Sequence, residues 1–204
     1  MKLIVGTYRK NAYIERCLTS VDQHLKDVTD IVFVDDSGDP DNSAWLRQYG
    51  DVVEVGGKGY GPAMKLVCEA AEGQESMFLE EDFTFIKPVR LNDLSAILFD
   101  RPYLAQIALL RGPHFPIEHE HGGLLEALRA KNHSINLVHG VHEQTATFTC
   151  NPAVWRGSVF EAGWPQVKWS EDRKRDLLLR QGWRFGFEDG IAVAHDGERT
   201  GHGY

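Results

Sequence analysis

The chain has 204 residues, of which 42% are hydrophobic and 25% are charged, and this composition excludes a disordered, collagen-like or coiled-coil protein. Its length suits one domain with its own core, and we expect residues 1–204 to form a single domain. With 30 acidic and 22 basic residues the net charge is −8, which disfavours binding of nucleic acid through a basic face.

The cysteines and the apolar segments indicate the cellular location of the protein. Cys17, Cys68 and Cys150 are far apart and form no CxxC pair, which indicates reduced thiols rather than a zinc ribbon or a disulfide framework. Residues 1–6 are too short for the apolar region of a signal peptide, and no stretch approaches the roughly 20 apolar residues of a membrane helix. We therefore expect a cytoplasmic protein without a membrane span.

The first half of the chain alternates strands with helices. Short apolar runs predict buried strands, and apolar residues three or four positions apart predict helices. In chain order we expect a strand at 3–7, a helix at 12–25, a strand at 31–34, a helix at 42–49, a strand at 52–55, a helix at 62–71 and a strand at 76–79. This order predicts an α/β fold with a parallel sheet flanked by helices.

The second half, from about residue 91, has a less regular pattern. We expect helices at 91–99, 154–162 and 171–181, strands at 103–110, 145–150, 183–187 and 191–194, and a loop rich in His and Pro at 113–123. This half is therefore predicted to be mixed.

Polar clusters follow three of the four strands of the first half: Thr7-Tyr8-Arg9, Asp35-Asp36 and Glu80-Glu81-Asp82. Ligands of parallel sheets bind beyond the carboxyl ends of the strands, so we expect these clusters to converge on one crevice. Successive carboxylates repel one another unless a cation or solvent intervenes, and Mg²⁺ takes carboxylates together with substrate phosphates. From spacing alone, a solvated strand end explains the acidic triplet equally well, and the aspartate pair also suits a turn.

Two further segments have both a structural and a functional interpretation. The glycine-rich loop at 57–61 precedes a helix whose N-terminus favours anions, but it also reads as a flexible loop. Glu171 and Asp172 follow the potential N-cap Ser170, where acidic residues stabilise the helix dipole. The alternative is that one of these carboxylates is a general base at the rim of the crevice.

The histidines differ in their setting. His119, His121, His139 and His142 fall into no known zinc pattern, so we expect them at the surface. His195 ends an apolar strand, where a neutral imidazole either ligates a metal or caps the strand.

Together, and in this order, these segments resemble glycosyltransferases of the GT-A fold, family 2 type. Residues 6–9 (GTYR) are similar to that family's opening P-T-Y-N-R, and residues 34–37 (VDDS) to its V-D-D-G-S. The glycine-rich loop resembles its N-x-G-x-G-x-A segment, residues 79–83 (LEEDF) its acidic D-x-D segment, and residues 170–172 (SED) its E-D pair. Residues 151–156 and 163–165 resemble the segment before its acceptor site, and residues 180–183 (RQGW) its R-x-G-[WY]. The similarity spans nearly the whole chain.

The resemblance implies a Rossmann-like sheet, with a nucleotide-sugar-binding half at about 1–90 and an acceptor-side half at about 91–204. It implies a nucleotide-diphosphate sugar donor, a Mn²⁺ or Mg²⁺ ion held by Asp82 and His195, and inverting transfer of one sugar with Asp172 as general base. The acceptor is not identified. The implied donor-binding residues are Thr7, Tyr8, Arg9, Asp35, Asp36, Gly59, Lys65, Glu80 and Glu81. The implied acceptor side contains Trp164, Trp169 and Glu171, with the loop at 111–123 and the tail at 201–204.

The chain departs from the family pattern at three places. Gly57 stands where Asn is usual, Met64-Lys65 where Arg-Asn is common, and Glu80 where Asp is commoner, so Lys58 or Lys65 would replace a missing arginine. Two other functions stay open: a sugar-phosphate nucleotidyltransferase, whose G-x-G-x-R-L signature the chain lacks, and a non-catalytic module that binds a nucleotide sugar or a glycan.

Overall fold

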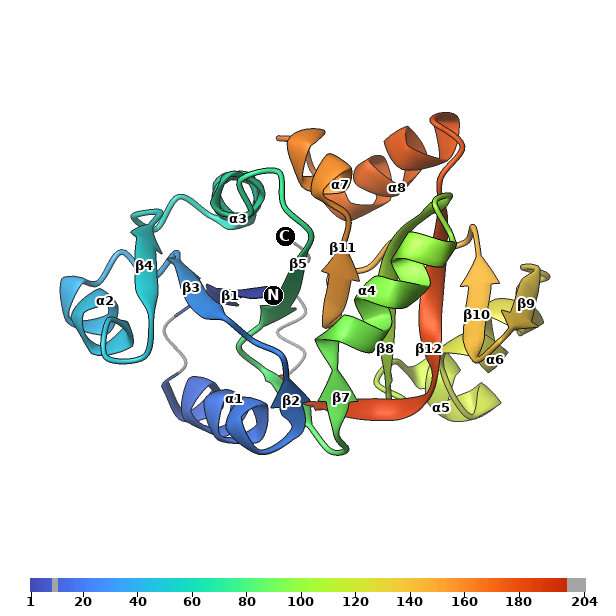
Figure 1. The fold of residues 1–204 in the computed structure, drawn as a ribbon, viewed down its shortest axis with the longest axis horizontal. Helices are drawn as coiled ribbons and strands as arrows, with labels where there is room; N and C mark the ends of the chain where they lie inside the picture. Colours follow the sequence, from blue (N-terminus) through green and yellow to red (C-terminus); the bar gives the residue numbers. More distant parts are fainter. Residues whose placement is uncertain (9–10, 198–204) are drawn as a thin grey trace.

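A computed structural model describes residues 1–8 and 11–197 of the chain. The strands of its main sheet are β1 (Lys2–Thr7), β3 (Asp30–Asp35), β4 (Asp51–Glu54), β5 (Ser76–Glu80), β6 (Phe83–Phe85), β8 (Leu104–Arg111), β9 (Ile135–Val138), β10 (Val141–Gln144), β11 (Ala153–Trp155) and β12 (Arg184–His195). Their order across this ten-stranded sheet is β4-β3-β1-β5-β11-β8-β12-β10-β9, with β6 paired to β12 (Figure 1). The short strands β2 (Leu25–Lys26) and β7 (Val89–Arg90) pair with each other.

Helices lie on both sides of the sheet (Figure 1). They are α1 (Asn11–His24), α2 (Pro40–Leu46), α3 (Tyr60–Ala70), α4 (Leu91–Asp100), α5 (Pro116–His121), α6 (Leu124–Ala130), α7 (Gly157–Glu161) and α8 (Ser170–Arg180).

The sheet is parallel in its first half and mixed in its second. Strands β4, β3, β1 and β5 are all parallel neighbours, whereas β11 joins β5 to β8 through antiparallel pairs. Beyond it, β12 runs parallel to β8, and β10 and β9 add antiparallel strands. The predicted α/β fold, with a central and largely parallel sheet flanked by helices, is confirmed.

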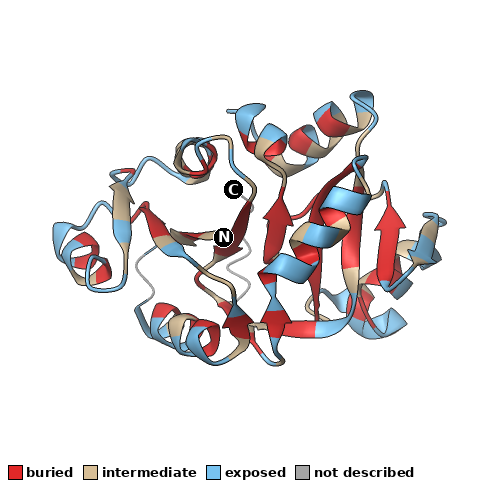
Figure 2. Ribbon diagram, in the orientation of Figure 1, coloured by how far each residue is buried: buried red, intermediate tan, exposed pale blue. Residues whose placement is uncertain are grey.

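Each face of the sheet carries its own apolar core, because successive residues of a strand point to opposite faces. In β1, Leu3 and Val5 pack in one cluster with residues of α1 and α4, whereas Ile4 packs in another with residues of α3, α7 and α8. Figure 2 shows the central strands almost entirely buried between these two layers. The core thereby fixes the strand ends, where the polar clusters lie.

The second half differs from the prediction in several elements. Residues 145–150 form a loop and no strand, because the Gln144 side chain bonds both the amide and the carbonyl of Thr147 and replaces a strand partner. Residues 154–162 are not one helix, since the buried strand β11 precedes α7. The expected loop at 113–123 contains α5, which begins at Pro116, and the two closing strands are the single irregular strand β12. Helix α6 and strands β9 and β10 were not predicted.

Two further expectations concern cysteines and membranes. All three cysteines are buried and free, so none forms a disulfide. Across residues 1–8 and 11–197, no helix has the length and apolar character needed to cross a bilayer.

Candidate functional site

The carboxyl ends of the parallel strands meet at one edge of the sheet. Thr7 is in register with Asp35 on β3, and Gly6 is in register with Glu80 on β5. The Thr7 hydroxyl donates a hydrogen bond to Asp35 Oδ1 over 3.3 Å. The polar ends of β1 and β3 therefore touch, as the sequence predicts.

The segment after β1 is tied to the acidic triplet. The amide of Tyr8 donates to Glu81 Oε1 over 3.0 Å, and the amide of Glu81 donates to the carbonyl of Gly6. Glu81 is buried, whereas the Tyr8 side chain is half exposed. Arg9, the third residue of this cluster, lies outside the described residues.

Asp35 is buried and surrounded by hydrogen-bond donors. Besides Thr7, its carboxylate accepts from the amide and hydroxyl of Ser37, the amide nitrogen of Asn42 and the hydroxyl of Ser43, at 2.7 to 3.0 Å. A carboxylate has about four lone-pair sites, so these five bonds leave none for a ribose or a base. Asp35 therefore joins β1, β3 and α2, and differs from the expected donor contact.

Asp36 shapes the glycine-rich loop. Its two carboxylate oxygens accept from the amides of Lys58 and Gly59, at 2.7 and 2.8 Å. Gly59 is the N-cap of α3, and its φ of +91° is a conformation that favours glycine. Lys65, on α3, is exposed and lies 3.6 Å from Glu69 on the same helix. The loop is thus held against the end of β3, beside the start of a helix.

The pair proposed to hold a metal is assembled by strand pairing. In the ladder between β6 and β12, His195 lies opposite Phe83, which follows Asp82. His195 Nε2 lies 3.3 Å from Asp82 Oδ2, and the imidazole stacks on Phe83 with ring centroids 4.5 Å apart. The ring of His114 also packs on His195, at a centroid distance of 4.1 Å.

These residues fit a divalent cation as part of its coordination. Asp82 Oδ1 and His195 Nδ1 are buried polar atoms without a hydrogen-bond partner among the described residues. Gly197 leaves room beside them, because a Cβ there would collide with the Asp82 carboxylate. Over residues 1–8 and 11–197, no group of three or more His, Cys, Asp or Glu side chains is arranged for a metal. Two protein ligands completed by phosphate oxygens and water suit Mg²⁺.

The two carboxylates at the start of α8 have different surroundings. Glu171 is partly buried, and its Oε1 accepts a hydrogen bond from the amide of Cys150 over 3.1 Å. Burial raises the pKa of Glu171 to about 7. Asp172 is exposed, and its Oδ1 lies 2.8 Å from a guanidinium nitrogen of Arg175.

Glu171 also belongs to a buried polar group that the sequence did not reveal. The Tyr60 hydroxyl, at the start of α3, lies 3.2 Å from Cys150 Sγ. Burial raises the pKa of Tyr60 and of Cys150, and the charges of Glu80 and Glu171 act in the same direction on both. The end of β5 and the start of α8 therefore approach each other through Tyr60 and Cys150.

The two tryptophans expected on the acceptor side have different positions. Trp164 is buried and stacks on Trp155 with centroids 6.1 Å apart, so it belongs to the core. Trp169 is exposed, and Lys168 lies over its ring. Among the histidines, His119, His121 and His139 are at the surface as predicted, whereas His142 is buried with Nε2 2.8 Å from Asp189.

A cavity of about 640 Å³ joins the end of β12 to the start of α8. Glu171 and His195 both line it, together with Thr149 and Asn151 of the loop after β10 and residues of α5 and α6. The sequence indicated the loop at 111–123 as an acceptor segment but not α6. The signal for α6 was its run of strong helix formers, LLEALRA at 124–130, which is only two turns long.

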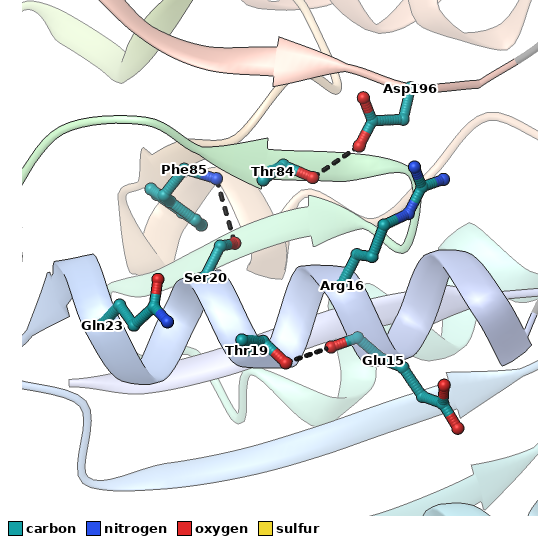
Figure 3. A pocket seen from close by; sticks show the side chains of 8 residues that line it. All are labelled: Glu15, Arg16, Thr19, Ser20, Gln23, Thr84, Phe85 and Asp196. Atoms are coloured by element: carbon teal, nitrogen blue, oxygen red, sulfur yellow. Dashed lines mark hydrogen bonds between the residues drawn. The ribbon is translucent and has the colours of Figure 1, made fainter.

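A second, more open cavity of about 580 Å³ lies between α1 and β6. Figure 3 shows Arg16 reaching from α1 toward the side of Asp196, whose carboxylate accepts a hydrogen bond from the Thr84 hydroxyl. Ser20, also on α1, bonds the amide of Phe85. The Ser20 bond attaches α1 to β6, the strand that carries Phe83, next to the pair Asp82 and His195.

The fold is shared with glycosyltransferases of known structure. One similar structure is the mannosyltransferase PcManGT from Pyrobaculum calidifontis in complex with GDP-Man and Mn²⁺, with a TM-score of 0.69 and 17% identity over 98% of this chain. Another is TarS 1-349 of S. aureus, with TM-scores of 0.60 alone and 0.59 in complex with UDP, and 17% identity over 95% of this chain.

The similarity is limited in two respects. The chain covers 57% of the PcManGT chain and 59% of the TarS chains, which is less than two thirds of their length. No family model matches the chain, and neither does any curated protein in a sequence search. The structural comparisons therefore show the fold.

Proposed function

We propose that this protein is a metal-dependent inverting glycosyltransferase that moves one sugar from a nucleotide-diphosphate sugar to an acceptor hydroxyl. The observation that carries the proposal is the pair Asp82 and His195, 3.3 Å apart beside the carboxyl end of β5, in a fold shared with glycosyltransferases. Of those structures, PcManGT is in complex with GDP-Man and Mn²⁺ and one TarS 1-349 structure is in complex with UDP, which supports a nucleotide-sugar donor here.

In this proposal the donor lies along the ends of β1, β3 and β5. Thr7 and Tyr8 border it on one side, and Glu80 and Glu81 on the other, with Arg9, outside the described residues, as a further proposed donor contact. Asp35 and Asp36 act mainly as positioning residues, because their oxygens already accept from the protein. Gly59 and the N-terminus of α3 face the diphosphate, with Lys58 or Lys65 as the cation that replaces the family's arginine.

Asp82 and His195 would hold a Mn²⁺ or Mg²⁺ ion, which stabilises the negative charge on the departing diphosphate when bound. The acceptor hydroxyl oxygen forms the new bond to the anomeric carbon while the bond from that carbon to the diphosphate breaks. A carboxylate opposite the leaving group takes the hydroxyl proton. One displacement without a covalent enzyme intermediate inverts the configuration at the anomeric carbon.

We assign to Asp172 the role of the base that takes the acceptor hydroxyl proton, and to Glu171 a positioning role. The ion pair between Asp172 and Arg175 is exposed, and such pairs contribute only about 0–1 kcal/mol, so Asp172 can turn toward an acceptor at little cost. Glu171 is held at the wall of the cavity by the Cys150 amide. Its position in the cavity makes Glu171 the second candidate for the base.

Thermal unfolding with a panel of nucleoside diphosphates, with and without Mn²⁺, tests the proposal. A ligand that binds only the native state stabilises it by about 2.7 kcal/mol at a hundredfold excess over Kd. We expect a shift that requires Mn²⁺ and is largest for one base. If no diphosphate shifts the transition, with or without Mn²⁺, glycosyl transfer from a nucleotide sugar is excluded. A shift for one diphosphate with no transfer from any of its sugar derivatives favours the binding module.

A further inference from the structure

The cavity beside Glu171 has an apolar part that the proposed chemistry does not require. Its lining from α5 and α6 includes the apolar side chains of Phe115, Pro116, Ile117, Leu124, Ala127 and Leu128. Phe115 is one of the more exposed large apolar residues of the chain. A hydroxyl, a base and a leaving group need none of these residues, so they point to an additional apolar portion of the ligand.

The rest of the lining is polar. Thr147, Thr149 and Asn151 come from the loop after β10, Glu171 from α8 and His195 from the end of β12. The cavity therefore has polar groups where it adjoins the proposed reaction site and apolar groups along α5 and α6. A ligand that fills it would be amphipathic.

Arg111 lies in the wall of the cavity and is held there by Glu118. It lines the cavity, is only 6% exposed, and donates from its two terminal nitrogens to the carboxylate of Glu118 at 2.6 and 3.0 Å. Within the described part of the chain its Nε has no hydrogen-bond partner.

The charges of the cavity argue against a strongly anionic ligand. Arg111 is neutralised by Glu118, and the other lining cation outside the imidazole is Lys131, which is exposed. A polyphosphate acceptor would also face the carboxylate of Glu171. The lining instead suits a neutral ligand with hydroxyl groups at one end.

We propose that this cavity binds the acceptor, and that the acceptor is a glycoside carrying an alkyl or aryl group next to its sugar. The apolar group lies against α5 and α6, and the sugar lies by Thr149 and Asn151. The volume of about 640 Å³ is within the range of small-molecule sites. The inference rests on the proposed glycosyl transfer, because it takes the bound hydroxyl to be the group that is glycosylated.

The test compares phenyl glycosides with the corresponding methyl glycosides, for glucose, galactose, mannose and N-acetylglucosamine in both anomeric forms. Binding is measured by calorimetry on the full chain with Mn²⁺. We expect at least one phenyl glycoside to bind about tenfold or more tightly than its methyl counterpart, since burying an aryl group removes apolar surface from water. Equal binding of every phenyl and methyl pair would overturn the proposal.

Two variants place the preference in the cavity. Leu128→Gln puts an amide into the apolar lining and should abolish the phenyl preference. Leu177→Gln, an exposed position on α8 outside the cavity lining, should leave it unchanged. A preference that survives Leu128→Gln would overturn the assignment, provided that thermal unfolding shows the variant folded. Phe115 is an exposed residue of the same lining, so Phe115→Ala repeats the test if Leu128→Gln does not fold.

The outcome is separable from that of the proposed function. Mn²⁺-dependent binding of a nucleoside diphosphate without any phenyl preference would retain glycosyl transfer and exclude this class of acceptor. A preference for phenyl glycosides that Leu128→Gln abolishes, without binding of any nucleoside diphosphate, would retain the glycoside site and exclude transfer from a nucleotide sugar.

Discussion

The carboxylate of Asp82 and the imidazole of His195 lie 3.3 Å apart, although 113 positions separate them in the chain. The antiparallel pairing of β6 with β12 brings them together, since it sets His195 opposite Phe83. The amide of Asp196 also donates to the carbonyl of Asp82 over 2.8 Å. The backbone therefore holds the two residues side by side, as the proposed cation site requires.

The first prediction concerns this pair. Asp82→Asn and His195→Gln should each weaken Mn²⁺-dependent binding of the preferred nucleoside diphosphate by about 100-fold, because each removes a protein ligand and few others are available. Isothermal titration calorimetry measures the loss. Asp93→Asn, at an exposed position of α4, serves as the control and should bind as the parent does. Unchanged affinity in both site variants would exclude this metal site.

The second prediction separates the two carboxylates of α8. Asp172→Asn should lower kcat by about 10²-fold or more, since it removes the proton acceptor, and should leave nucleoside diphosphate binding unchanged. Glu171→Gln should keep more of the activity, because its amide oxygen can still accept from Cys150. Steady-state transfer assays on both variants decide the assignment. Activity retained in Asp172→Asn and lost in Glu171→Gln would reverse the two roles.

Much of this arrangement follows from the sequence, and its limits have physical reasons. Apolar runs alternating with segments of helical spacing predicted the parallel half, where β1, β3 and β5 are largely buried and end in polar residues. The prediction of one helix at 154–162 was wrong because a run of three buried apolar residues, Ala153–Trp155, fits a strand and a helix equally well. The prediction of a strand at 145–150 was wrong because the side chain of Gln144, and not a neighbouring strand, bonds the amide and the carbonyl of Thr147 in this loop.

Residue roles were harder to predict than strand ends. The pattern V-D-D-S marks Asp35 and Asp36 but cannot show that internal donors occupy their oxygens. Similarly, the residue type of Trp164 is compatible with stacking on a sugar. Only its contact with Trp155 places it in the core. These distinctions depend on tertiary contacts that no local pattern carries.

The third prediction concerns the hydrogen bonds of Asp35. Asp35→Ala leaves the buried donors Ser37, Asn42 and Ser43 without their acceptor, so it should destabilise the fold by about 3 kcal/mol. Urea unfolding measures the change. Asp22→Ala, at an exposed position of α1, should stay within about 0.5 kcal/mol of the parent. A similar small change in Asp35→Ala would contradict the role of Asp35 as the structural centre of this strand end.

The fourth prediction is a pH dependence of stability that originates at Glu171. Burial raises the pKa of Glu171 from 4.5 to about 7, so between these values the folded state binds more protons than the unfolded state. Stability then falls as the pH rises through this window, and the full contribution is present only below the unfolded value. The loss approaches a limit of about 3 kcal/mol above pH 7.

Glu171→Gln cannot ionise, so its stability should exceed that of the parent at pH 8 and match it more closely at pH 4.5. Urea unfolding of both proteins from pH 4.5 to 8 measures this, and Asp22→Asn, at an exposed position of α1, is the control, expected to retain the parent's slope. Parallel curves for the parent and Glu171→Gln would show that Glu171 titrates normally and that its contact with Cys150 does not isolate it from solvent.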